Sequence, residues 1–194
     1  MKGDLKMMTG EKRYSNTAYL ALCGLFAALT AVCTYISIPL GFTPVPVNLA
    51  TLAVFLAGGI LGMKYGTVSL MVYVLLGAVG LPVFSNFSGG PGVLMGPTGG
   101  YIAGYIAAAF IVGFICDRAF AASLSGPKKT AVCVLAMICG LTACYFLGTA
   151  WFMYSTGTGL IASLVACVIP FLIGDGLKII AASLLVVRLR PLLF

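Results

Sequence analysis

The stretch that decides the fold is residues 169–187, IPFLIGDGLKIIAASLLVV, an apolar run that carries Asp175 and Lys178 near its middle. A run of this length suits a membrane-spanning helix, so both charges are expected at bilayer depth. A charge at mid-membrane costs about 2.5–3.5 kcal/mol on insertion scales, and such residues commonly serve a ligand, an ion or a proton. A spacing of three places both side chains on one helix face. The pair is therefore either part of a binding site or an ion pair that only fixes helix packing.

The composition extends the membrane interpretation to the whole chain. Of its 194 residues, 61% are hydrophobic and 8% are charged, whereas soluble domains carry about 25% charged residues. We therefore expect a polytopic membrane protein with a single domain, 1–194. The chain has no histidine and four acidic residues, which argues against histidine-based catalysis and metal-dependent hydrolysis. We expect no enzymatic activity, no metal and no cofactor, and we interpret the seven cysteines as small buried hydrophobes.

Six apolar segments are long enough, or nearly so, to cross the hydrocarbon. The second and third are short and are joined by a tight turn, and Pro170 should bend the sixth because it removes a backbone donor. The predicted spans are residues 16–38, 47–62, 65–81, 99–117, 129–154 and 159–187. Residues 1–15 form a predicted cytoplasmic tail. The first span is long for a signal peptide and lacks a clear cleavage site, so we expect it to be retained.

The basic residues agree with six spans. Ten of the eleven Lys and Arg residues fall on one side, and the opposite loops, residues 39–46, 82–98 and 155–158, contain none. The positive-inside rule places that basic side in the cytoplasm, together with both termini. We therefore expect the protein to lie in the plasma membrane of the cell. The net charge of +7 therefore reflects topology and does not indicate nucleic-acid binding. The ten residues are Lys2, Lys6, Lys12, Arg13, Lys64, Arg118, Lys128, Lys129, Arg188 and Arg190.

The two longer outer loops are rich in proline and glycine, IPLGFTPVPVNLATL (38–52) and GLPVFSNFSGGPGVLMGPTGGY (80–101). The second also contains Phe84, Asn86, Phe87 and Tyr101. Aromatic walls with an amide suit a small ligand that has an apolar ring and a polar edge. The alternatives are rigid connecting turns, with Asn86 as a turn former and the aromatics as core or interfacial anchors.

Several of these motifs resemble one known family. GLPVF (80–84) and GPTGGY (96–101) resemble the signature of the BioY family, the biotin-specific substrate-binding (S) components of energy-coupling factor transporters. PVPVNLATLAVFLAGGILG (44–62) resembles the first outer loop and second helix of that family, and the resemblance covers essentially the whole chain. One departure is that the family usually has a Thr-x-Gln pattern after its Pro-x-Pro element, where this chain has Asn48 and Ala50.

The resemblance implies a fold, a ligand and partners. The fold is an all-α integral membrane protein of six helices with an outward-facing pocket under the Pro/Gly loops. The ligand is biotin, with Asp175, Lys178 and Asn86 as contacts, and Phe84, Phe87 and Tyr101 as an apolar sleeve; which contact meets which end of biotin is open. The implied partners are a transmembrane coupling protein and two ATPase subunits. This chain itself has no P-loop motif for ATP.

The resemblance also implies that small residues of helix one meet the coupling protein, and two such stripes are present, Gly24-x-x-x-Ala28 and Ala27-x-x-x-Ala31. Small residues let helices approach closely in lipid, although the same stripes also serve packing inside a bundle.

Two other functions remain open at this point. The protein could be an S component for another vitamin, such as thiamine or riboflavin. It could also be a self-sufficient proton-coupled carrier with Asp175 as the proton site.

Overall fold

The computed structural model describes residues 16–41, 43–122 and 124–194 and is built almost entirely from helices. The expected tail, residues 1–15 with its four basic residues, lies outside the described residues. The elements in chain order are α1 (Asn16–Tyr35), β1 (Ser37–Ile38), β2 (Val47–Asn48), α2 (Ala50–Ala78), η2 (Ser85–Phe87), α3 (Pro91–Met95), α4 (Gly99–Ala121), α5 (Gly126–Thr156), α6 (Leu160–Cys167), η3 (Ile169–Phe171) and α7 (Leu172–Leu193).

Five helical stretches are long and apolar enough to cross a membrane, and one of them, α2, contains two spans. At Gly62 the backbone leaves the helical region, with φ +78° and ψ −177°. The backbone at Gly66 lies against Ala57 and Gly58, whereas eight residues along a straight helix would be about 12 Å apart. The chain therefore reverses at Gly62, and the second and third predicted spans form a hairpin inside α2. The protein is an all-α integral membrane protein with six transmembrane helices.

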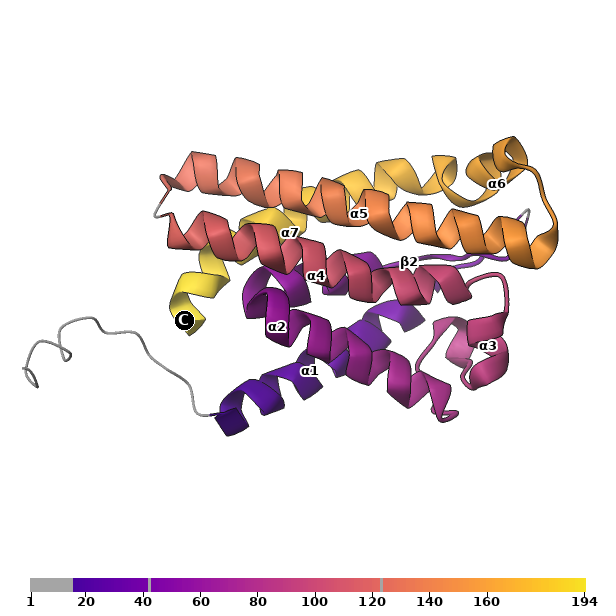
Figure 1. Ribbon diagram of the computed structural model, residues 1–194, viewed down its shortest axis with the longest axis horizontal. Helices are drawn as coiled ribbons and strands as arrows, with labels where there is room; N and C mark the ends of the chain where they lie inside the picture. Colours follow the sequence, from indigo (N-terminus) through magenta and orange to yellow (C-terminus); the bar gives the residue numbers. More distant parts are fainter. Residues whose placement is uncertain (1–15, 42, 123) are drawn as a thin grey trace, which may run out of the picture.

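The two ends of the bundle differ in character (Figure 1). The start of α1, the α4–α5 turn and the C-terminus lie at one end, while α3 and the start of α6 lie at the other. The six described basic residues of the loops and termini belong to the first end: Lys64, Arg118, Lys128, Lys129, Arg188 and Arg190. This is the cytoplasmic end, so the Pro/Gly-rich loops are on the outside.

Helix α4 lies at the centre and packs on α2 and on α5 through small residues. Gly58 of α2 lies against Ala109 and Val112, and Gly140 of α5 lies against Ala108 and Val112. Close contact between small residues is the main source of helix association in lipid, where no hydrophobic driving force acts between helices. The cysteines follow the same logic, since all but Cys139 are buried and all seven are free.

An ion pair at the cytoplasmic end holds the α2 reversal. Asp117 of α4 pairs with Arg190 of α7, and its other oxygen, Oδ2, accepts the N–H of Met63 at 2.9 Å. Arg190 also donates through Nη1 to the carbonyl of Gly59 at 2.9 Å. The last helix is thereby fastened to both sides of the turn at Gly62. Asp117 carried no predicted role.

The sixth predicted span is broken rather than merely bent. Val168 adopts φ −125° and ψ −58°, and the short η3 turn containing Pro170 separates α6 from α7. A proline inside a helix removes one hydrogen bond and clashes with the preceding turn, which accounts for the break.

Substituting Gly62 with alanine should destabilise the protein by about 1–3 kcal/mol, because a residue with a Cβ must adopt a positive φ there. The added Cβ would also contact the Asp117 carboxylate. Thermal unfolding in detergent measures the effect. Gly24→Ala is the matched control, since nothing lies within 4 Å of a Cβ at that position. Equal melting temperatures for the two variants would show that the reversal does not depend on Gly62.

Candidate functional site

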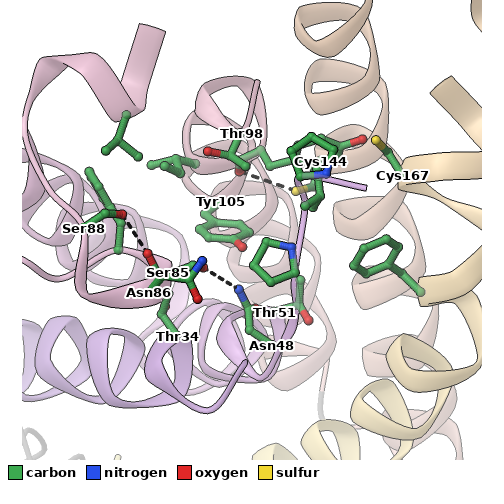
Figure 2. A pocket seen from close by; sticks show the side chains of 18 of the residues that line it. Thr34, Asn48, Thr51, Ser85, Asn86, Ser88, Thr98, Tyr105, Cys144 and Cys167 are labelled. Atoms are coloured by element: carbon green, nitrogen blue, oxygen red, sulfur yellow. Dashed lines mark hydrogen bonds between the residues drawn. The ribbon is translucent and has the colours of Figure 1, made fainter. Parts of the chain in front are cut away.

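A cavity of about 160 Å³ lies in the outer half of the bundle, beneath the two Pro/Gly-rich loops. Its walls come from the segment 44–51, from the 84–88 turn, from the start of α4, from α5 and from the broken last span. Figure 2 shows side chains from these separate elements converging on one space. The predicted outward-facing pocket is therefore present, and helix ends and turns far apart in the sequence form it.

Asp175 and Lys178 form a buried charged pair in the lining of this cavity. Lys178 Nζ lies 2.7 Å from Asp175 Oδ1, and the two residues are 8% and 2% exposed. Thr51 of α2 donates to Asp175 Oδ1 at 2.9 Å and accepts from Lys178 Nζ at 3.1 Å. Tyr145 of α5 donates to Asp175 Oδ2. The pair thus faces the cavity and not the lipid, and side chains of α2 and α5 satisfy it.

The ion pair keeps hydrogen-bonding capacity for a ligand. An ammonium group has three N–H donors. Within the described part of the chain, bonds to Asp175 and Thr51 occupy two of the three on Lys178. A carboxylate offers about four acceptor positions, and Asp175 receives three donors, from Lys178, Thr51 and Tyr145. The pair can therefore offer a guest one donor and one acceptor side by side.

A second polar group lies toward the outer loops. Asn48 Nδ2 donates to Ser85 Oγ at 3.1 Å, and Asn48 Oδ1 accepts the N–H of Ala50 at 3.0 Å, which caps the start of α2. Ser88 Oγ donates to the carbonyl of Ser85 at 2.7 Å. Figure 2 shows Asn48 and Ser85 joined by this hydrogen bond. Asn86 also lines the cavity, and its φ of +59° shows that it is a turn former as well.

Two of the three predicted sleeve aromatics line the cavity. Phe84 is 1% exposed and meets Tyr73 edge to face, with ring centroids 5.6 Å apart. Tyr101 is held by a 3.1 Å hydrogen bond between its hydroxyl and Thr149. Both rings contribute apolar surface to the lining of the cavity.

Phe87 departs from the expectation. It is 68% exposed, lies outside the cavity and stacks on Tyr35, with centroids 4.4 Å apart. Asn86 and Phe87 both have positive φ, at 59° and 54°. Two consecutive left-handed residues turn the chain so that Phe87 points out over α1. Its contact fixes the loop to α1 and does not form a sleeve.

The model of the BioY family matches residues 7–193 of this chain. The chain belongs to the BioY family. Among BioY proteins, the biotin transporter BioY of Thermotoga maritima is 41% identical over 175 residues, covering 89% of this chain and 96% of that protein. The biotin transporter BioY of Lactococcus lactis subsp. cremoris is 30% identical over 183 residues, covering 94% of each.

A solved structure has the same fold. It is a 2.1 Å crystal structure of the S-component for biotin from an ECF-type ABC transporter. The match has a TM-score of 0.81 and 29% identity, and covers 92% of this chain and 95% of that chain. The six-helix arrangement is therefore that of the solved protein.

The cavity includes residues that the sequence analysis missed. Thr51, Tyr73, Tyr105 and Tyr145 all line it. Thr51 directly follows Asn48 and Ala50, the two positions that depart from the usual BioY pattern. That departure was the sequence signal that could have pointed to Thr51. Ala50 itself is fully buried, while Asn48 keeps a polar side chain at the cavity. Nothing in the sequence of α5 distinguishes Tyr145 from its aromatic neighbours.

Removing one member of the ion pair should destabilise the protein more than removing both. Lys178→Met leaves Asp175 buried without its cation, at an expected cost of about 3–5 kcal/mol. The double variant Asp175→Leu, Lys178→Met removes both charges, and buried pairs replaced by apolar residues are often neutral or stabilising. Thermal unfolding of the wild type, of Asp175→Leu, of Lys178→Met and of the double variant gives the coupling free energy between the two charges. A double variant as unstable as the sum of the singles would contradict the desolvation argument.

Proposed function

We propose that this protein is the substrate-binding subunit of a biotin uptake transporter. It captures biotin from outside and delivers it across the membrane together with an ATP-driven energy-coupling factor module. The observation that carries the proposal is the buried Asp175–Lys178 pair, which offers one acceptor and one donor inside an outward-facing cavity. The relatives named as biotin transporters support the ligand. The solved S-component for biotin supports both the ligand and the partner module.

The ureido group of biotin is the part that fits the ion pair. A cyclic urea places an N–H donor next to a C=O acceptor, so one edge can donate to Asp175 and accept from Lys178. The pair and the ureido group together remain neutral. Asp175 already neutralises the charge of Lys178. A ligand carboxylate at this depth would therefore add an unbalanced negative charge, which is costly in a low dielectric.

The rest of biotin then follows the cavity outward. Its thioether ring meets the apolar surface of Phe84 and Tyr101, which line the cavity. Its carboxylate lies nearer the mouth, where Asn48, Ser85 and Asn86 provide amide and hydroxyl donors close to water. We propose this orientation for the contacts that the sequence left open.

The delivery step depends on partner proteins. The chain contains no P-loop motif, so the energy of ATP enters through the two ATPases and the transmembrane coupling protein. Of the two small-residue stripes on α1, only Gly24 and Ala28 face outward, whereas Ala27 and Ala31 are buried inside the bundle. We therefore restrict the docking stripe to Gly24 and Ala28 and assign Ala27 and Ala31 to internal packing.

Asp175→Ala or Lys178→Ala should weaken biotin binding at least tenfold, which corresponds to about 1.4 kcal/mol. Biotin methyl ester should keep most of the affinity for the wild type, because only the mouth meets the carboxylate. Isothermal titration of the purified protein with biotin, its methyl ester, thiamine and riboflavin measures this. Phe87→Ala is the matched control and should bind like the wild type. Tight binding of thiamine or riboflavin in place of biotin, or full affinity in both site variants, would refute the assignment.

Gly24→Trp should reduce co-purification with the coupling protein and its ATPases, because a bulky side chain prevents close helix approach. Biotin binding by the isolated subunit should be unchanged, since Gly24 is far from the cavity lining. Leu135→Trp, at another exposed position on α5, controls for a bulky residue facing lipid. Co-purification of Gly24→Trp at the wild-type level would exclude this stripe.

A further inference from the structure

A second cavity lies between α5 and α6, in the outer half of the bundle, with a volume of about 320 Å³. We call it the α5–α6 groove. Its lining residues are Thr142, Tyr145, Phe146, Thr149, Ala150, Met153, Leu160, Leu164 and Val168. It is separate from the cavity that Asp175 and Lys178 line, which we call the biotin cavity. Nothing in the proposed function uses the groove.

The chemistry of the groove suits an alkyl chain. Its hydroxyls have partners, since Thr142 donates to the carbonyl of Ile138 at 2.9 Å and Thr149 bonds to Tyr101. The groove continues into the surface that faces hydrocarbon, where Phe146 is 74% exposed and Ile161, next to Leu160, is 80% exposed. An extended peptide in this place would carry backbone polar groups without partners, whereas a hydrocarbon chain carries none.

The wall between the groove and the biotin cavity is thin. Tyr145 lines both spaces, and its hydroxyl donates to Asp175 on the cavity side. Thr149 lines the groove and bonds to Tyr101, which lines the cavity. The broken segment of the last span contributes in the same way, with Val168 on the groove and Phe171 on the cavity.

We propose that the α5–α6 groove binds one acyl chain of an outer-leaflet phospholipid, and that this chain holds Tyr145 against Asp175. With the groove filled, the Tyr145 ring has no free space on its lipid side, so its hydroxyl stays on the carboxylate. With the groove empty, the ring can turn into the groove, and Asp175 loses one of its donors. Ligand affinity therefore depends on the bound chain. This second half of the proposal rests on the proposed function, whereas the lipid site itself does not.

Two groove-filling variants test the site, Ala150→Trp and Leu164→Phe, with Leu135→Trp as the control that adds bulk at an exposed position outside the groove. None of the three residues lines the biotin cavity. Each protein is washed in dodecyl maltoside, and the retained phospholipid is counted by native mass spectrometry. Biotin is then titrated before and after adding back dioleoyl phosphatidylglycerol.

The expected result is that the wild type and Leu135→Trp retain one phospholipid more than the two groove-filling variants. Stripping lipid should weaken biotin binding by the wild type by at least about threefold, roughly half a log unit, and leave the groove-filling variants unchanged. Equal retention in all four proteins would overturn the lipid site. Unequal retention with lipid-independent affinity in the wild type would overturn the link through Tyr145. If the filled variants keep their phospholipid but lose the coupling protein on co-purification, the occupant is a protein helix and the proposal fails. If the wild type does not bind biotin at all, the proposed function fails. The phospholipid count then still decides whether the lipid site exists.

Discussion

The structure depends on keeping two opposite charges out of contact with lipid. Taking an aspartate and a lysine into a low dielectric costs several kcal/mol per ion, and their attraction offsets this only when the remaining hydrogen-bonding positions are also filled. Here two other helices occupy those hydrogen-bonding positions, through Thr51 of α2 and Tyr145 of α5. The last helix can meet this requirement only by docking with the correct rotation and depth. The same contacts that satisfy the charges therefore also place them at the cavity.

A second ion pair fixes the opposite end of the same helix. Arg190 reaches Asp117 of α4 and the carbonyl of Gly59 in α2. Much of α7 between the two pairs is apolar and faces lipid, with Leu177 66% and Ile180 57% exposed. Apolar contacts with lipid and with protein are similar in energy, so they do not define the position of a membrane helix well. Polar contacts at both ends of α7 fix its position instead. Both acidic residues in the described part of the chain, Asp117 and Asp175, take part in these contacts.

The sequence predicted much of this, and the limits of the prediction have physical causes. Six spans and their orientation followed from apolar length and from the positions of Lys64, Arg118 and the other basic residues, because the bilayer imposes both constraints on each segment by itself. The inward direction of Asp175 and Lys178 followed from the cost of exposing them to lipid. Phe87 was misplaced because its direction depends on two consecutive backbone torsions, and no residue type specifies these. Ala27 and Ala31 were misplaced because a small-residue stripe looks the same whether it packs inside the bundle or against a partner.

The contacts made by Tyr145 and Thr51 could not be predicted from sequence, since they depend on which helices become neighbours. The break of the last span at Val168 and Pro170 lies beside these contacts, with Phe171 on the cavity and Val168 on the groove. A continuous straight helix would present one face along its whole length, either to the cavity or to α5. On one side of the break α6 lines the groove together with α5, and on the other side α7 places Asp175 at the cavity. Backbone irregularity at membrane depth is tolerated where it lines a cavity, and here it lies between two. One broken span therefore borders both the polar cavity and the apolar groove.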